Sequence, residues 1–316
     1  MLRRLLPLLA CICLFAPACG WPQCRPGPLS VSNQYPLTSL HLSLAPRAAT
    51  VCDAGSTRLS LNGIWSNTSI VEDQYTVDAE SIDLTPALSY AAAQDLELSL
   101  ALPLLWRVGG TLDSTIDRWH RVFGLPRGDR RKLEDNAVQI RGATKNGDIF
   151  AYEEEGFEFG NLKAGLKYAW APEFAYLGEL SLPTSSGTFG HSGVDLLNGL
   201  LYSRQFEQFI WYSGVAHVFI GEDESSGVSF ERNHFEAFGG GEYRLGASYA
   251  VLANLSAQSK VLNNVASHPS YALYLDLGFR AAIGRSSWLD LGIRENPLPG
   301  DGTTDISFIA GISTAY

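Results

Sequence analysis

The sequence predicts an all-β protein: a transmembrane antiparallel β-barrel of about 12 strands, with one short helix in a long external loop. Apolar residues recur at every second position in twelve segments between residues 57 and 316, which is the period of a β-strand. One side of these segments carries no charged residue, and many have about the 9–11 residues that a tilted strand needs to cross a bilayer. The connections alternate between short and long, as in outer-membrane barrels.

Composition and hydropathy exclude two other classes of protein. The 316 residues include 23 Lys and Arg against 33 Asp and Glu, which argues against a protein that binds nucleic acid through positive charge. The only long apolar run covers residues 5–18, and no later run reaches the roughly 20 residues of a membrane-spanning helix. Any insertion into a membrane therefore uses strands.

Residues 1–18 have the layout of a bacterial secretory signal peptide, because two arginines precede an apolar run that ends in small residues. Removal of this segment leaves three cysteines in an oxidising compartment. One explanation for the odd number is that Cys19 is lipidated while Cys24 and Cys52 form a disulfide. The alternative is ordinary signal cleavage next to Cys19, without a lipid.

Residues 19–55 are rich in Pro and show no steady alternation. They form either a periplasmic tail or a plug folded into the barrel. Residues 56–316 form the predicted barrel, which includes a long external loop at 107–158.

The predicted strands follow one another along the barrel region. Their apolar, outward faces run from Leu59 to Trp65, Ile82 to Tyr90, Leu96 to Trp106, Leu162 to Trp170, Phe174 to Leu182, Leu196 to Tyr202, Ile210 to Ile220, Phe235 to Tyr243, Tyr249 to Ala257, Tyr271 to Phe279, Leu289 to Ile293 and Ile306 to Tyr316. Aromatic residues gather where these faces meet the short connections. This position predicts an aromatic girdle at the boundary between lipid and water. The final strand ends on an aromatic residue and resembles the terminal signature that the barrel-assembly machinery recognises.

The opposite faces of the strands supply the candidate lumen lining. Their charged and titratable residues include Arg58, Asp83, Glu97, Lys163, Lys167, Glu179, His217, Glu236, Asp276, Arg280, Asp290 and Arg294. With Asp195 and Glu242, this face carries eight acids against five Lys and Arg. Such charges either pair across the lumen and close it or leave a mildly cation-preferring path. The bulky inward residues Leu105, Trp211, Phe219, Phe238, Tyr274 and Trp288 are expected to narrow the bore.

The long loop contains two predicted elements. Apolar residues recur at helical spacing between Leu112 and Phe123, which predicts a short amphipathic helix. Its candidate constriction residues are Ile116, Trp119, His120 and Phe123; the alternative is that the helix lies on the outer leaflet. Residues 138–152 predict a hairpin, and the barrel has fourteen strands if that hairpin joins the wall. Basic residues at 127–132 either contact lipopolysaccharide or form a solvated run of charge.

No catalytic or cofactor-binding motif is convincing, so we expect neither enzymatic activity nor a cofactor. The lining leads us to expect a narrow, gated or occluded channel for small solutes. The alternatives are a structural or surface-binding barrel with a packed lumen and, less favoured, an outer-membrane enzyme that modifies lipids.

Several short motifs carry a resemblance to a known family. They are Gly27-Pro28-Leu29, Asn33-Gln34-Tyr35-Pro36-Leu37, Trp65-Ser66-Asn67, Leu102-Pro103-Leu104, Leu112-Asp113, Ile116-Asp117, Trp119-His120 and Phe123-Gly124-Leu125-Pro126. With these motifs the chain resembles an uncharacterised family of proteobacterial outer-membrane proteins, defined as a domain of unknown function. The resemblance implies a barrel in the outer membrane of a Gram-negative bacterium, in contact with its lipid and lipopolysaccharide. It implies no activity and no site residue.

The two alternatives for the predicted helix make different predictions for a deletion of residues 111–124. If the helix restricts access to the lumen, the deletion raises single-channel conductance in planar bilayers. If the helix is a surface anchor, conductance stays unchanged, because the barrel mouth was never covered.

Overall fold

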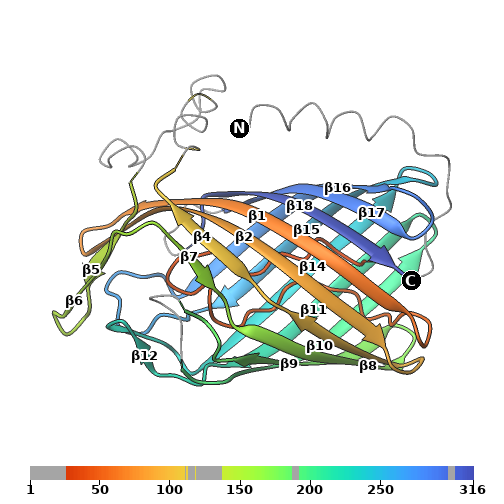
Figure 1. Cartoon of the computed structure of the whole chain (residues 1–316), viewed down its shortest axis with the longest axis horizontal. Coiled ribbons are helices and arrows are strands. Elements are labelled where there is room, and N and C mark those ends of the chain that lie inside the picture. Colours follow the sequence, from red (N-terminus) through yellow and green to blue (C-terminus); the bar gives the residue numbers. More distant parts are fainter. Residues whose placement is uncertain (1–25, 111, 113–117, 119–136, 187–191, 298–302) are drawn as a thin grey trace.

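The computed structural model describes residues 26–110, 112, 118, 137–186, 192–297 and 303–316, which form a closed antiparallel β-barrel (Figure 1). Its strands are β1 (Thr57–Val71), β2 (Tyr75–Ala91), β3 (Leu96–Ala101), β4 (Leu104–Val108), β5 (Gln139–Ala143), β6 (Ile149–Tyr152), β7 (Gly156–Phe159), β8 (Leu162–Ala171), β9 (Phe174–Leu182), β10 (Asp195–Phe206), β11 (Phe209–Phe219), β12 (Glu224–Ser225), β13 (Val228–Ser229), β14 (Asn233–Arg244), β15 (Tyr249–Ser259), β16 (Tyr271–Ala282), β17 (Ser287–Glu295) and β18 (Ile306–Ala315). Among the described residues, no helix is long and apolar enough to cross a bilayer.

The wall has the twelve strands that the sequence predicts, and neighbours in the chain pair throughout. β1 closes the barrel, because it pairs with β18 on one side and with β2 on the other. β3 and β4 both pair with β2 and act as one wall strand, interrupted at Leu102 and Pro103. A proline lacks the N–H that a ladder needs, which accounts for the break. β7 and β8 likewise pair with β4 and β3 and form one interrupted wall strand.

The hairpin of the long loop does not add two strands to the wall. β5 pairs with the end of β2, from Tyr75 to Asp78, and β6 pairs only with β5. The hairpin therefore extends the sheet beyond one end of the barrel, and the alternative of fourteen wall strands is wrong.

The sequence also predicts a long connection over residues 66–79, between the first two strands, and this prediction is wrong. β1 and β2 run without interruption to a tight connection at 72–74, and they are 15 and 17 residues long. Polar residues after Trp65 favour an early end of the first strand, but Ser66 is fully buried and donates a hydrogen bond to Ser307 Oγ at 2.8 Å. The strands continue because Ile70 and Val77 pack in an apolar cluster beyond the charged part of the lumen.

The outward faces of eleven wall strands are those that the sequence predicts. Exposed apolar residues on these faces include Leu59, Leu98, Leu200, Phe235 and Leu277. Aromatic rings gather near the short turns, where Trp170 stacks on Phe174 with 6.1 Å between centroids and Tyr249 stacks on Phe279 with 5.5 Å. This arrangement is typical of an interfacial girdle.

The exception is β11, whose faces are reversed. Its even positions, predicted to face lipid, are buried; its odd positions, including Trp211 and Val215, are exposed. Both faces of this strand are apolar, so alternation alone does not identify the outer one. The inner face packs on Leu42 and Leu44, which belong to the chain inside the barrel.

Residues 26–50, here called the lumenal segment, run through the interior of the barrel without joining its sheet (Figure 1). The segment has two limbs, at 26–34 and 42–50, joined by an apex at 35–41. The limbs are linked by the Asn33 N–H, which donates to Ser43 Oγ at 3.0 Å. Gly27 has a φ of 87° and approaches Ala48 so closely that a Cβ there would lie 2.8 Å from the Ala48 nitrogen. The two limbs are therefore in contact at their open end as well.

The first limb fits a notch in the barrel wall. Gly278 of β16 pairs with Gly292 of β17, and both face inward toward Leu29, which is 1% exposed. A Cβ at Gly278 would lie 2.5 Å from Leu29 Cδ1 and 2.9 Å from the Leu291 carbonyl oxygen. The missing side chains make the room that Leu29 fills.

We predict that Gly278→Ala lowers the free energy of unfolding by about 1–3 kcal/mol, because it overpacks this notch. The same substitution in a Leu29→Ala background should cost less, since part of the clash is gone. Thermal unfolding in detergent of the two single variants and the double variant tests this. Equal costs in both backgrounds would contradict the packing of Leu29 against Gly278.

Candidate functional site

The lumenal segment is held by acceptors on the wall that take up its backbone N–H groups. Leu42 N–H donates to Asp195 Oδ2 at 3.0 Å, and Leu44 N–H donates to Glu236 Oε2 at 2.5 Å. Ala49 N–H donates to Ser203 Oγ at 2.8 Å. These residues project inward from β10 and β14. A buried backbone group without such a partner is costly, so side chains replace the sheet partners that this segment lacks.

The wall also supplies donors to the backbone carbonyls of the segment. Arg280 Nη1 donates to the Gly27 oxygen at 2.7 Å, and Arg294 Nη1 donates to the Ser32 oxygen at 2.9 Å. At the apex, Arg107 Nη2 donates to the Pro36 oxygen at 3.2 Å. The fork of a guanidinium suits this role, because it satisfies a carbonyl and a carboxylate at the same time.

Acidic residues fix these guanidinium groups. Arg294 donates to both oxygens of Asp276, at 2.6 and 3.0 Å, and both side chains are at most 2% exposed. Arg280 donates to both oxygens of Asp290, at 2.6 and 2.8 Å, and to Glu242 at 2.7 Å. Buried pairs of this kind contribute little net stability, but removal of one partner leaves a buried charge uncompensated. Their effect here is to hold the arginines against the lumenal segment.

Two buried histidines lie beside the acids that accept the backbone N–H groups. His41 Nδ1 lies 3.5 Å from Asp195 Oδ2, and His234 Nε2 lies 3.0 Å from Glu236 Oε1. Gln258 Nε2 also donates to Glu236 at 2.6 Å. Each acid is therefore the centre of a small polar network.

At the end of the barrel that carries the long loops, an apolar cluster surrounds the apex of the lumenal segment. Its buried members are Tyr35, Leu37, Ile70, Tyr75, Val77, Ala79, Val138, Ile140, Phe150, Ile220, Val228, Phe230, Val261, Leu262 and Val265. They come from the apex, the adjoining ends of β1 and β2, the β5–β6 hairpin and the loops around β13 and after β15. This cluster fills the described part of the lumen at that end.

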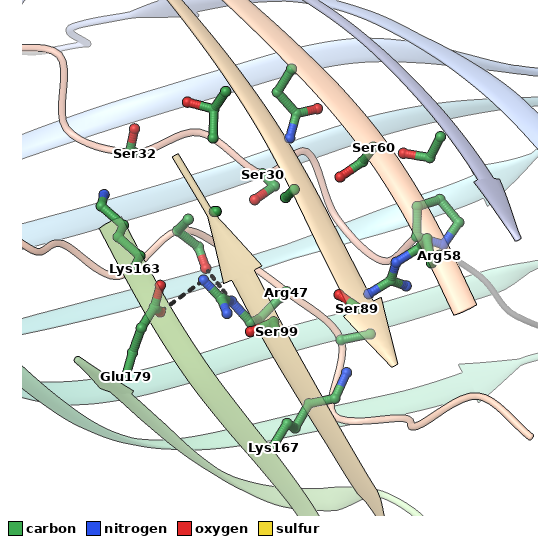
Figure 2. Close-up of a pocket in the computed structure, with 18 of the residues that line it drawn as sticks. Ser30, Ser32, Arg47, Arg58, Ser60, Ser89, Ser99, Lys163, Lys167 and Glu179 are labelled. Atoms are coloured by element: carbon green, nitrogen blue, oxygen red, sulfur yellow. Dashed lines mark hydrogen bonds and ion pairs between the residues drawn. The ribbon is translucent and has the colours of Figure 1, made fainter. Parts of the chain in front are cut away.

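Beside the lumenal segment, toward the short turns, lies a polar cavity of about 170 Å³ (Figure 2). It is bounded by the segment on one side and by inward residues of the wall on the other, chiefly from β1, β2, β3 and β8, with Glu179 of β9, Asp290 of β17 and Ser313 of β18. Many of these wall residues are small, among them Ser60, Ala87, Ser89, Ser99 and Ala101. Small side chains on this side leave the space that the segment does not fill.

Charged residues of opposite sign pair along the cavity. Arg47 Nη2, from the lumenal segment, lies 3.0 Å from Glu179 Oε2. Figure 2 marks this ion pair with a dashed line. Glu97 has two cationic neighbours: Lys167 at 3.2 Å and Arg58 at 3.4 Å.

Most of the predicted lumen residues either line the cavity or hold the lumenal segment. Arg58, Glu97, Lys163, Lys167, Glu179 and Asp290 line the cavity. Glu236, Asp276, Arg280 and Arg294 belong to the networks that hold the segment. Asp83 is buried and accepts a hydrogen bond from Thr85 Oγ1 at 2.6 Å. Three of the six predicted acids and three of the five predicted cations thus line the cavity, while Arg280 and Arg294 hold the segment.

His217 is not a lumen residue. It lies on the outer face of β11, with its ring 5.2 Å from that of Phe235 and its Nε2 3.0 Å from Asn233 Oδ1. The reversal of β11 also places Trp211 and Phe219 outside, whereas Leu105, Phe238, Tyr274 and Trp288 are buried inside as predicted.

Sequence reasoning missed Arg47 and Arg107. Arg47 lies in a segment without alternation, so no pattern assigns it to the lumen. Arg107 continues the inward register of Leu105, and extension of that strand by one pair would have found it.

Cys52 is in a disulfide, as expected, but Cys19 and Cys24 lie outside the described residues, and their roles stay predictions. The proposed constriction at Ile116, Trp119, His120 and Phe123 also lies outside them.

Within the described ranges, no group of three or more His, Cys, Asp or Glu side chains is arranged to hold a metal ion.

The family model described as protein of unknown function (DUF3187) matches residues 5–316, so the chain belongs to this family. This confirms the resemblance to a family of unknown function. A search of curated proteins found no significant match.

Among solved structures, the chain is similar to the COG4313 outer membrane channel from Pseudomonas putida F1, with 11% identity and a TM-score of 0.58 over 87% of this chain and 100% of that chain. It is also similar to the NanC porin, with 10% identity and a TM-score of 0.48 over 81% of this chain and 98% of that one. A third similar structure is the Pseudomonas putida toluene transporter TodX, with 11% identity and a TM-score of 0.44 over 94% and 97% of the two chains. At 11% identity, the similarity to the COG4313 channel shows the fold alone, and it supports the barrel predicted from the sequence.

We predict that Asp195→Asn combined with Glu236→Gln loosens the second limb, because both carboxylate acceptors of its backbone N–H groups become neutral. Trypsin cleavage after Arg47, the only Lys or Arg in residues 26–50, should become about tenfold faster. Mass spectrometry of the released peptides measures this. Glu231→Gln, which changes an acid in an external loop, is the control and should not alter cleavage. Equal rates in all three proteins would contradict the anchoring role of the two acids.

Proposed function

We propose that this DUF3187 member is a narrow outer-membrane channel for small solutes, and that the lumenal segment occludes it. The observation that carries the proposal is a segment that runs through the lumen without joining the sheet, next to a polar cavity. A segment that lies across a lumen in this way blocks the passage of solutes, and its displacement would open a path for them.

The manner of attachment supports a movable element. Strand pairing would make the segment a permanent part of the wall, whereas side-chain hydrogen bonds contribute only about 0.5–1.5 kcal/mol each, or about 1.5–3 when one partner is charged. The wall donors and acceptors hold it at separate points along residues 27–49. In this proposal the arrangement described here is the closed state.

A structural barrel with a packed lumen is the second candidate. Two apolar clusters favour it: the one around the apex and a second that joins Leu42 and Leu44 to β9, β10, β11 and β14. Burial of these side chains opposes displacement of the segment. This candidate predicts a protein that never conducts, which separates it from a channel.

A lipid-modifying enzyme has less support. Ser192, from the Gly190-His191-Ser192-Gly193 motif, donates its hydroxyl to Glu222 Oε1 at 2.9 Å. Among the described residues, the partner of this serine hydroxyl is a carboxylate, whereas a serine hydrolase pairs the hydroxyl with a histidine that a third group orients. His191 lies outside the described residues.

The same proposal places the protein in the outer membrane of a Gram-negative bacterium, with its short turns in the periplasm. The exposed apolar belt would face lipid, and the long-loop end would face lipopolysaccharide. The barrel-assembly machinery would insert the chain during biogenesis.

Single-channel recording in planar bilayers tests the proposal. The full-length protein should show brief, small openings, and Asp195→Asn with Glu236→Gln should raise the open probability about tenfold, because the closed state loses two charged acceptors. Deletion of residues 28–48, which keeps Gly27 and Cys52, should give a larger conductance that is always open.

The control for these recordings is again Glu231→Gln, which should behave like the unaltered protein. If neither the variant nor the deletion conducts, the channel proposal fails and the packed structural barrel is the better account.

A further inference from the structure

The charges around the cavity do not balance. Four cationic side chains line it, from Arg47, Arg58, Lys163 and Lys167, and three acids do so, from Glu97, Glu179 and Asp290. Asp290 is engaged by two hydrogen bonds from Arg280. Four cations therefore face three acids, which leaves a surplus of one positive charge in the lining, in a chain of net charge −10.

Lys163 is the cation without a close acid. Among the described residues, no carboxylate lies within ion-pair distance of its ammonium group. Asp83 makes no hydrogen bond or ion pair with Lys163 and interacts with it only by longer-range electrostatic attraction. Lys167 lies four residues further along β8, on the same inward face, and its Nζ is 3.2 Å from Glu97 Oε1. Lys163 is therefore the group in this cavity that is available to an anion.

Hydroxyl groups surround the same space. Ser60, Ser89 and Ser99 project into it from three neighbouring strands, and in the described part of the chain their side chains have no hydrogen-bond partner (Figure 2). Hydroxyls both donate and accept, so they can bind the hydroxyls of a solute or the water that surrounds it. Cationic groups and hydroxyls together are suited to a small carboxylate that carries hydroxyls of its own.

We propose that the cavity between the lumenal segment and strands β1, β2, β3 and β8 is a binding site for small hydroxylated carboxylates, with Lys163 as the principal cation. The inference rests on the proposed channel function and names its substrate class. Arg47 belongs to the lumenal segment, so this segment contributes one of the cations of the site. The volume of about 170 Å³ is many times the roughly 10–15 Å³ that one buried water needs, so the cavity has room for a small molecule.

Binding can be measured without conduction, on the full-length protein in detergent. Isothermal titration with gluconate, with glucose as the uncharged comparison, should give binding for gluconate alone. Lys163→Gln should weaken gluconate binding about tenfold, and Lys163→Arg should restore most of it. Lys260→Gln is the matched control, since Lys260 pairs with Glu231 in an external loop, and it should bind like the unaltered protein.

Three results would overturn the site: equal binding of glucose, unchanged affinity in Lys163→Gln, or binding of inorganic phosphate but not of gluconate.

Reversal potentials in a KCl gradient give a second readout. The full-length protein should prefer chloride, and Lys163→Gln should reduce that preference; a preference for potassium would overturn the inference even if the Lys163 variant does not fold.

The two readouts separate this inference from the channel proposal. Gluconate binding without any conductance retains the site and rejects the channel. Conductance without gluconate binding retains the channel and rejects the site, and the absence of both rejects the two together.

Discussion

The buried backbone of the lumenal segment imposes the main constraint on the interior of this barrel. Residues 26–50 pair with no strand, yet most of them are buried, so their N–H and C=O groups must find partners on wall side chains. Asp195 and Glu236 accept from the N–H groups, and Arg280 and Arg294 donate to the carbonyls. The chemistry of the wall is thus matched to a backbone, which has the same groups at every residue.

Barrel size explains why such a segment is needed. Eight strands enclose a space that side chains can fill, whereas sixteen or more leave a water-filled channel. Twelve strands lie between these cases, and here two limbs of irregular chain occupy much of the interior. Shape complementarity on one side, as at Gly278 and Gly292 around Leu29, contrasts with small residues on the other side, which leave the cavity. The segment therefore divides the lumen into a packed half and a polar half.

Much of the fold could be predicted from the sequence because lipid and lumen impose opposite demands on alternate residues. Eleven wall strands show this contrast clearly. β11 does not, since its inner face packs on Leu42 and Leu44 and is as apolar as its outer face. The first connection differs from the prediction for a related reason: a polar residue such as Ser66 indicates the end of a strand, yet Ser66 is buried inside the barrel. Alternation identifies faces only where the lumen is polar.

The candidate site was less predictable, because it depends on which charges lie near one another. A count over the inward faces gives more acids than bases and favours a path for cations. That count assumes charges spread evenly around the wall. The lumenal segment removes this symmetry: Asp195, Glu236 and Asp276 are engaged by the segment or by the arginine that holds it. Lys163 and Arg58 lie on strands that the segment does not cover, and Arg47 adds a further cation from the segment itself. A solute in the cavity thus meets a local excess of positive charge inside an acidic protein, and a local field of that kind, within low-dielectric walls, determines which ions enter.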